Sequence, residues 1–445
     1  MPDNARLTHG SIRGHLIQQT APMLLGIASI LSVGIIDAYY IGQLGADELA
    51  AVSFIFPVTM ALASLGVGVM VGISSVVSRA LGANELALAQ QRGNLGMALA
   101  VMSGLAIAGT LYLVKEPLFE LMQAEGKLLP LIDAYMTPFA LGFPLLLTNM
   151  GGNGVLRSQG AAKRSSAVLI AYAGANWILD PILITGVGSF EGFGVAGAAY
   201  ATLAGWGVGT VLGFALVQTS QITFNPTSLF RADWRSDVWA LIKVGAPAAG
   251  TNAINPVGLS IMTALLAGYG QDHVAGFGAA GRLQSFAVVP LLALSSSIGA
   301  VVGQNWGAQK RGRARSALFQ AGAFCVGYGL LIAAVLVLGR DGFAAIFSED
   351  PGVLDAISAY LLIAAWGFSG YGVLIVVNGA LNAIDRASHA LMMSLGRVFL
   401  VMVPVAWLGG RAFGPNAIYG AELAANLIGG LVAFGLARHI MRRES

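Results

Sequence analysis

The chain has 445 residues, of which 56% are hydrophobic and 10% charged, and its formal net charge is +3. A soluble domain carries about 25% charged residues, so this composition excludes a soluble globular protein and gives no reason to expect a nucleic-acid partner. Apolar runs of about 20 residues, long enough to cross a hydrocarbon core, recur along the whole chain without polar alternation, which excludes a membrane β-barrel. The composition therefore predicts an all-α integral membrane protein.

Twelve apolar segments predict twelve transmembrane helices. The first six are expected over 14–41, 49–79, 88–114, 128–156, 165–188 and 194–217. The last six are expected over 238–268, 274–304, 314–338, 353–381, 388–410 and 415–437. Prolines inside helices cause kinks, and the candidate kink sites here are Pro22, Pro144, Pro247 and Pro290.

The most polar connection lies at the middle of the chain. It predicts an N-terminal six-helix lobe over 1–217, a cytoplasmic linker over 218–237 and a C-terminal six-helix lobe over 238–445. A shift of 225 residues aligns the two halves, so that Pro22 meets Pro247 and Tyr135 meets Tyr360. An even number of spans in each half gives parallel repeats, which are typical of secondary transporters that bind substrate between two lobes.

The loop charges predict the orientation. Connections on the side of the N-terminus hold 17 Lys and Arg residues, and the opposite connections hold 4. Basic residues are in excess in cytoplasmic loops, so both termini of this multi-pass protein are expected in the cytoplasm.

Acidic residues inside the spans are the first candidates for function, because a charge there costs about 2.5–3.5 kcal/mol on insertion scales. At about 1.5 Å per residue, Asp37 lies roughly 7 Å and Asp180 about 12 Å inside the outer ends of their helices. Asn176 lies one turn from Asp180 on the same face, and Thr202 reaches a similar depth on the next helix. Four oxygen-bearing side chains of one lobe suit a proton site or a hard cation such as sodium, and the residues leave both open.

The second half lacks this set. The repeat partner of Asp37 at the shift of 225 is Met262, and those of Asn176, Asp180 and Thr202, where the shift is 223, are Phe399, Val403 and Ala425. This asymmetry favours a single coupling site in the N-terminal lobe. The alternatives are that Asp37 snorkels or caps near its helix end, and that Asp180 makes a structural hydrogen bond before Pro181.

Three further polar groups lie inside the second half. Arg282 and Glu422 are predicted to form a buried pair, with two independently snorkelling residues as the alternative. Arg397 has no assigned role. In the first half, Tyr135 and Asn153 on the fourth span add neutral hydrogen-bonding groups, although Asn153 is expected near the inner end.

Three stretches resemble the MATE (multidrug and toxic compound extrusion) family. They are "DAYYIGQLGADELAAVS" with Asp37, "ANWILDPILI" with Asn176 and Asp180, and "GVAGAAYAT" with Thr202. The resemblance implies twelve helices in two pseudo-symmetric six-helix bundles, and export of organic, often cationic, compounds in exchange for protons or sodium. It places the cation or proton site on Asp37, Asn176, Asp180 and Thr202, with Tyr135 and Asn153 in support and Pro22 as a bending point of the first helix.

The sequence departs from the NorM-type branch of that family, which has an acidic residue on the seventh helix where this chain has Asn255. A DinF-like multidrug exporter of a bacterial inner membrane is therefore predicted. Protonation of Asp37 would drive alternating access, because burial and a neighbouring carboxyl group both favour the protonated form. The expected partners are small organic substrates and membrane lipids, with a monomeric chain and no cofactor besides the coupling ion.

The sequence also bears on three other functions. A sodium-coupled antiporter would use the same site. A flippase for lipid-linked oligosaccharides would be expected to show more cationic residues facing the lobes. A membrane enzyme would need clustered His or carboxylate ligands, whereas the five histidines of this chain are dispersed.

Overall fold

The computed structural model describes residues 5–231 and 233–443, and helices dominate this part of the chain. It divides into two compact units, one formed by Met1–Arg6 and Ala21–Ala249 and the other by Leu7–Thr20 and Gly250–Ser445. The division falls inside two helices, α1 (Ile12–Gly42) and α7 (Trp234–Ala267).

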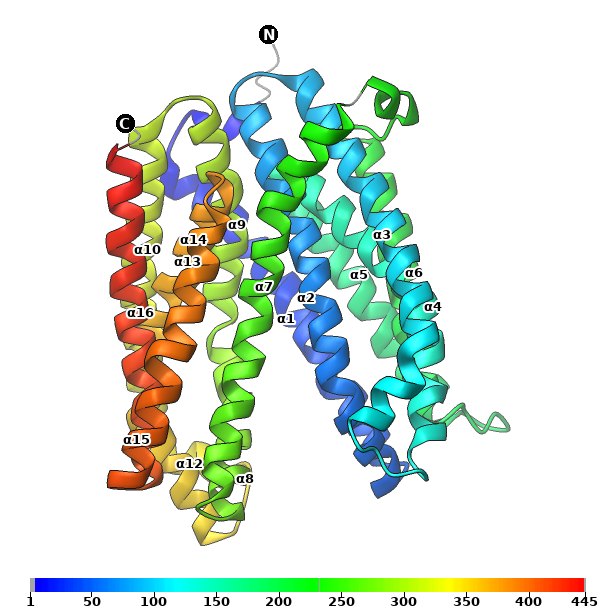
Figure 1. Ribbon diagram of the computed structural model, residues 1–445, viewed down its shortest axis with the longest axis vertical. Helices are drawn as coiled ribbons and strands as arrows, with labels where there is room; N and C mark the ends of the chain where they lie inside the picture. Colours follow the sequence, from blue (N-terminus) through cyan, green and yellow to red (C-terminus); the bar gives the residue numbers. More distant parts are fainter. Residues whose placement is uncertain (1–4, 232, 444–445) are drawn as a thin grey trace. The chain divides into compact units, whose positions relative to one another are not determined.

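The first unit contains most of α1, the start of α7 and five helices between them. These five are α2 (Ala46–Gly82), α3 (Leu86–Leu121), α4 (Leu129–Ser158), α5 (Ala162–Asp180) and α6 (Val195–Gln218). They run roughly alongside one another (Figure 1). α5 continues into a π-helical turn over Pro181–Thr185, and such turns are frequent at functional sites.

The second unit contains the rest of α7 and shorter helices that join into spans. They are α8 (Gln271–Ala287), α9 (Val289–Gly307), α10 (Arg311–Leu338), α11 (Arg340–Ala345), α12 (Pro351–Ala364), α13 (Phe368–Ala383), α14 (Ala387–Leu395), α15 (Val403–Phe413) and α16 (Pro415–Arg443). The α8–α9 span is bent by 46° beside Pro290, one of the expected kink sites. A π-helical segment over Gly396–Met402 joins α14 to α15.

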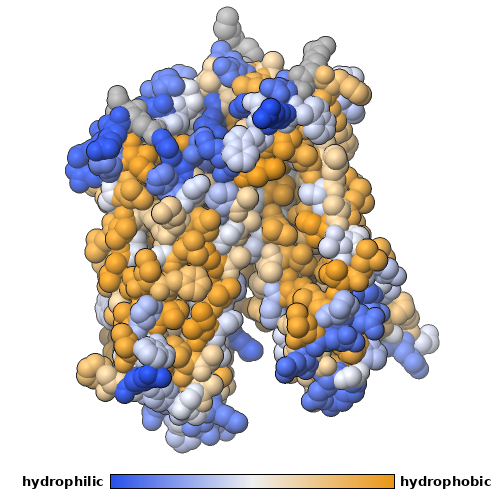
Figure 2. Space-filling model, in the orientation of Figure 1, coloured by the Kyte–Doolittle hydropathy of each residue, from blue (hydrophilic) through white to orange (hydrophobic). Residues whose placement is uncertain are grey.

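The helices confirm the twelve predicted spans. Among the described residues, ten helices or joined helices are long and apolar enough to cross a membrane, and the bent α8–α9 pair makes eleven. The remaining predicted span corresponds to α7, which has 34 residues. In each unit hydrophobic side chains cover the middle of the helices and hydrophilic ones gather toward the ends (Figure 2), as a bilayer requires.

Small residues hold the start of α7 in the first unit. A Cβ atom on Gly68 of α2 would lie 2.5 Å from the carbonyl oxygen of Gly245 and 2.7 Å from Cβ of Ala249. One on Gly72 would lie 2.8 Å from the carbonyl oxygen of Leu241. Small residues four apart let helix backbones approach closely in lipid, so this packing depends on the absence of side chains.

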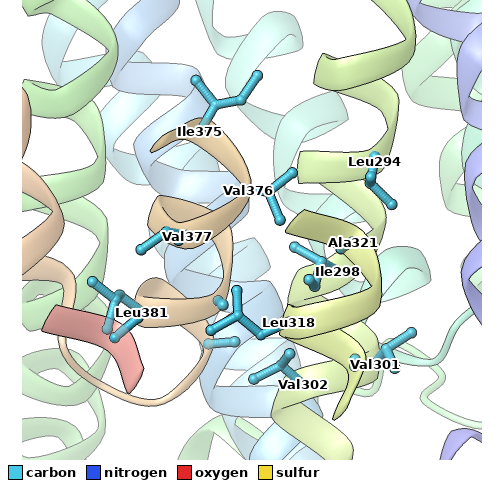
Figure 3. Packing of buried hydrophobic residues seen from close by; sticks show 14 of the residues in the cluster. Leu294, Ile298, Val301, Val302, Leu318, Ala321, Ile375, Val376, Val377 and Leu381 are labelled. Carbon is cyan, nitrogen blue, oxygen red and sulfur yellow. The ribbon is translucent and has the colours of Figure 1, made fainter. Parts of the chain in front are cut away.

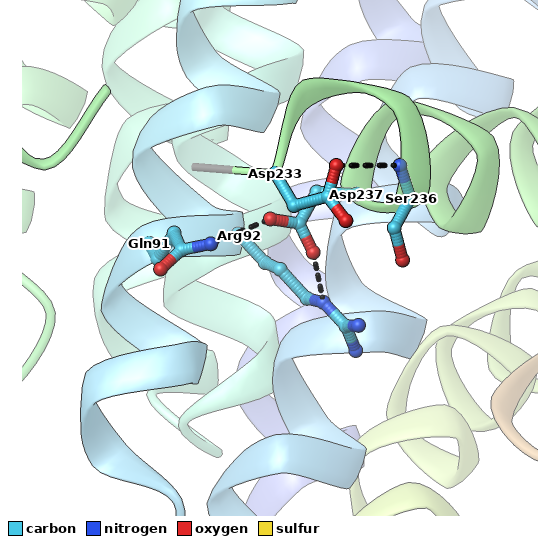
Figure 4. A network of polar contacts seen from close by, with 5 residues as sticks. All are labelled: Gln91, Arg92, Asp233, Ser236 and Asp237. Carbon is cyan, nitrogen blue, oxygen red and sulfur yellow. Dashed lines mark hydrogen bonds and ion pairs between the residues drawn. The ribbon is translucent and has the colours of Figure 1, made fainter. Parts of the chain in front are cut away.

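An ion pair reinforces the same attachment at the beginning of α7. Asp237 is 2% exposed, and its carboxylate accepts hydrogen bonds from Arg92 Nε at 2.8 Å and Gln91 Nε2 at 2.6 Å (Figure 4). Asp233, just before α7, accepts from the backbone N–H of Ser236 and caps the helix. The predicted linker 218–237 therefore lies inside the first unit; as a boundary between the repeated halves it stays a prediction.

The core of the second unit is aliphatic. Leu294, Ile298 and Val301 of α9 pack against α10 and α13 (Figure 3). Leu7, which is 1% exposed, joins this cluster from the N-terminal segment. Its backbone N–H donates to Gln304 Oε1 at 3.2 Å, and its carbonyl accepts from Asn305 Nδ2 at 3.0 Å. Leu7–Thr20 is thus fixed to the second unit.

Candidate functional site

The carboxyl groups of Asp37 and Asp180 lie in hydrogen-bonding contact. Asp37 is on α1, and Asp180 is the last residue of α5, with 0% of its surface exposed. Oδ1 of Asp37 is itself enclosed and has no hydrogen-bond partner among the described residues. Two carboxylates cannot hydrogen-bond, since each only accepts, so a hydrogen bond between these two groups would need a proton on one of them.

Asn176 and Thr202 complete the predicted group. The amide of Asn176 fits its surroundings with its nitrogen toward Asp180, an orientation assigned from its neighbours. Nδ2 then donates to both carboxylate oxygens of Asp180, at 2.5 and 3.0 Å, and Oδ1 accepts from the backbone N–H of Thr202 at 3.2 Å. Asn176 is 0% and Thr202 6% exposed. The structure therefore brings together all four residues that the sequence singled out.

Helix α1 lies parallel to α5 in a fixed register. Ser166 Oγ of α5 donates to the carbonyl oxygen of Pro22 at 2.5 Å, a separation of 144 residues. Trp177 Nε1 donates to Ser32 Oγ at 3.1 Å, a separation of 145 residues. The Asp37–Asp180 contact continues this register one turn further along. Gly26 permits the approach, because a Cβ atom there would lie 2.9 Å from Ser166 Oγ.

Two tyrosines lie near the acidic pair. Tyr135 of α4 and Tyr172 of α5 both lie within electrostatic reach of Asp37 and Asp180. A Cβ atom on Gly205 would lie 2.6 Å from the Tyr172 ring, so the glycine makes room for this side chain. Tyr135 was predicted and Tyr172 was missed. The sequence did contain a signal for Tyr172, because positions 172, 176 and 180 are four residues apart and so share one face of a helix.

Asn153 belongs to a separate network. Its Nδ2 donates to Asn149 Oδ1 at 2.7 Å, and its Oδ1 accepts from Ser165 Oγ at 2.7 Å. Ser165 also accepts from Arg157 Nε at 3.2 Å. The bonds of Asn153 therefore run toward the opposite end of α4 from Tyr135, and its predicted supporting role is not carried by any contact with the acidic pair among the described residues.

The second unit corrects the predicted Arg282–Glu422 pair. Glu422 of α16 is 3% exposed and contacts Gln284 Nε2 and the Tyr360 hydroxyl, each at 3.0 Å. Arg282 is exposed. Two residues along a helix turn by about 200°, so α8 presents Gln284 to Glu422 and Arg282 to the opposite side.

Arg397, which had no predicted role, is buried in the π-helical segment. Its Nη1 donates to Asn426 Oδ1 at 2.7 Å, its Nη2 donates to Asn255 Oδ1, and its guanidinium lies 5.5 Å from the Tyr371 ring centre. All three partners are uncharged. Nε of Arg397 is enclosed and has no partner in the described part of the chain.

The MatE family model matches residues 22–182 and 247–408. The chain belongs to the MatE family. The two matched stretches begin at Pro22 and Pro247, which are 225 residues apart, the shift that aligned the two halves of the sequence.

Relatives in the MatE family are transporters, which excludes the enzyme alternative. A protein of Shewanella oneidensis named FAD transporter is 34% identical, with 99% of this chain and 97% of that protein covered. The multidrug export protein MepA of Staphylococcus aureus is 24% identical, with 93% and 90% covered. A crystal structure of a mutant of the Vibrio cholerae MATE transporter VcmN matches with a TM-score of 0.92 at 28% identity, covering 100% and 99% of the two chains.

As a MatE protein, the chain is a multi-pass membrane transporter with the twelve-helix fold. Its acidic pair sits in the first unit, between α1 and the end of α5. A buried glutamate and a buried arginine sit in the second unit. These three features bear on what the transporter moves and on the ion that drives it.

Proposed function

We propose that this MatE transporter exports small organic compounds in exchange for protons, and that the Asp37–Asp180 pair carries the proton. The observation that supports this is the contact between the two carboxyl groups, in which a hydrogen bond would need one shared proton. When that proton leaves, two like charges face each other. At 4 Å such charges repel by about 4 kcal/mol at an effective dielectric constant of 20.

This repulsion acts on α1. The helix is tied to α5 at Pro22 and Ser32 as well as at Asp37. Losing the shared proton removes the Asp37–Asp180 contact and leaves the hydrogen bonds at Pro22 and Ser32. The contact at Pro22 involves a residue that already lacks one helix hydrogen bond, because proline has no backbone N–H. We propose that α1 then bends at Pro22 and that this change accompanies substrate movement.

Asn176 favours a proton over sodium. Its amide oxygen accepts from the Thr202 backbone and its nitrogen faces Asp180. A sodium site prefers oxygen ligands, and here the amide presents a hydrogen-bond donor to the carboxylate instead. Sodium coupling would require the amide to turn over, which exchanges both contacts for one hydrogen bond from its nitrogen to Thr202 Oγ1 at 3.4 Å.

The substrate has two candidates. The multidrug names of the MepA relatives favour organic, often cationic, compounds. The 34% identical relative named FAD transporter favours an anionic dinucleotide, and so does Arg397, a buried cation that contacts the neutral groups Asn255, Asn426 and Tyr371. Guanidinium groups bind phosphate oxygens in pairs, and Asn255 and Tyr371 beside Arg397 are only half-buried.

The loop charges and the resemblance to the DinF-like branch support a proposal for the membrane and the orientation. We propose a DinF-like transporter in a bacterial inner membrane, with both termini in the cytoplasm, acting as a monomer among lipids. Asn255, at the position of the NorM-type acidic residue, supports this branch because it holds Arg397 rather than offering a carboxylate.

The test uses purified full-length protein in proteoliposomes. We expect substrate addition to move protons equally with and without sodium, and Asp37→Asn to abolish this movement. Transport of FAD and of a cationic dye, each with wild type and Arg397→Leu, separates the two substrate classes. Asp37→Asn transport equal to wild type under a pH gradient would refute the proposed coupling.

A further inference from the structure

Glu422 lies in a closed ring of three polar groups in the second unit. Gln284 Nε2 and Glu422 Oε1 are 3.0 Å apart, Tyr360 Oη and Glu422 Oε2 are 3.0 Å apart, and Tyr360 Oη and Gln284 Oε1 are 2.8 Å apart. Three hydrogen bonds need three hydrogens, one in each contact. The amide supplies one and the phenol supplies one, because a tyrosine hydroxyl has a single hydrogen.

The third hydrogen has one source within the ring. If Tyr360 donates to Gln284, the Glu422–Tyr360 contact joins two oxygens with no hydrogen between them unless Glu422 is protonated. Turning the amide of Gln284 over does not change the count, because its oxygen then faces Glu422 Oε1 and again needs a hydrogen from the carboxyl group. In both arrangements each group donates once and accepts once when Glu422 carries a proton.

The phenol and the carboxyl group of this ring are buried, whereas Gln284 is half-buried. Tyr360 is 0% and Glu422 3% exposed. The rings of Phe277 and Tyr419 pack edge-on against Tyr360, each with its centre 5.5 Å away. Water is therefore kept from the hydroxyl, which must find its partners within the ring.

The charged and titratable groups around Glu422 are few. α12 contributes Tyr360, α13 contributes Tyr371, α16 itself contributes Tyr419, and the π-helical segment contributes Arg397. α8 contributes the uncharged amide of Gln284 and also His273, whose Nδ1 lies 3.4 Å from the Tyr419 hydroxyl. Arg397 lies within electrostatic reach of Glu422, and its guanidinium is bound to Asn255 and Asn426. The ring geometry points to the neutral acid despite this nearby cation.

The internal repeat gives a second, independent observation. Tyr360 is the repeat partner of Tyr135, which lies near the Asp37–Asp180 pair in the first unit. Each unit thus places a buried carboxyl group beside the tyrosine of its fourth span, although the carboxyl group comes from different helices. The repeat partners of Asp37 and Asp180 are apolar, and the acid beside this tyrosine in the second unit comes from α16 instead.

We propose that Glu422 is a second proton-binding site, and that its proton is exchanged during transport in addition to the one held by Asp37 and Asp180. The exchange rests on the proposed proton coupling, whereas the protonation of Glu422 stands on the ring alone. The transporter would then move two protons in each cycle, one through each unit.

The protonation is tested by infrared spectroscopy of the full-length protein in lipid. Protonated carboxyl groups give a carbonyl band that carboxylates lack. Glu422→Gln, which keeps one donor and one acceptor toward its neighbours, is expected to remove one component of this band, and Asp37→Asn a different one. Tyr360→Phe is expected to shift only the Glu422 component. A Glu422→Gln band identical to that of wild type would overturn the assignment.

The exchange is tested by the proton-to-substrate ratio in proteoliposomes. We expect Glu422→Gln to halve the ratio, while Asp47→Asn, the same kind of change at a carboxylate whose side chain is 57% exposed, leaves it unchanged. An unchanged ratio in Glu422→Gln would overturn the exchange and leave a fixed structural proton. Failure of the proposed function has another signature, namely normal pH-driven transport by Asp37→Asn with the Glu422 band still present.

Discussion

Replacing Asp37 with asparagine should change how the stability of the protein depends on pH. In the proposed mechanism the folded pair holds one proton, whereas aspartates in an unfolded chain ionise near pH 3.9. Above about pH 5, folding therefore takes up a proton, and the free energy of unfolding falls as pH rises until the folded pair releases it. One proton contributes a slope of about 1.4 kcal/mol per pH unit.

Asp37→Asn removes this proton without removing the hydrogen bond, because the asparagine amide can donate to Asp180 permanently. The variant should lose about 1.4 kcal/mol per pH unit of the wild-type slope and become more stable relative to wild type as pH rises. Unfolding followed by tryptophan fluorescence in detergent between pH 5 and 8 measures both slopes. The matched control is Asp47→Asn, the same change at a carboxylate whose side chain is 57% exposed.

Parallel pH dependence of Asp37→Asn and wild type would refute the shared proton. An equal change of slope in Asp47→Asn would also do so, because it would trace the effect to net charge rather than to the buried pair.

Two packing predictions accompany this one. Arg92→Ala leaves Asp237 buried without its cation and should lower the free energy of unfolding by about 3–5 kcal/mol, measured by chemical unfolding in detergent; a loss below 1 kcal/mol would show that Gln91 suffices. Gly26→Val should push α1 away from Ser166 and abolish transport with little loss of expression, while Gly34→Val, where a Cβ atom meets nothing within 4 Å, should be tolerated. Equal transport by the two glycine variants would contradict the fixed α1–α5 register.

The sequence was sufficient for the spans and for the acidic pair because both leave local signals. Asp37 and Asp180 interrupt apolar runs, and the one-turn spacing from Asn176 to Asp180 fixes a shared face. Pro290 likewise marked a bend that the structure contains. These signals depend on residues close in sequence, where helix geometry dictates which side chains meet.

The second unit was less predictable because its contacts join residues far apart in sequence. Depth alone suggested that Arg282 meets Glu422, but depth does not tell which face of α8 turns toward α16. Gln284 and Tyr360 carry no charge and give no hydropathy signal, so their ring with Glu422 could not be foreseen. Arg397 was visible as a charge, yet its amide partners lie on α7 and α16, more than 25 residues away on either side.

Because α1 and α7 each belong partly to one unit and partly to the other, the chain cannot be split between the units by a cut in a loop. A cut in the polar stretch 218–237 yields two fragments, and neither carries a whole folding unit. The N-terminal fragment lacks the beginning of α7 that packs on Gly68 and Gly72, and the C-terminal fragment lacks Leu7 and the segment around it. Neither fragment should accumulate when produced alone. When the two are produced together, each should supply the helical segment that the other lacks, and both should accumulate.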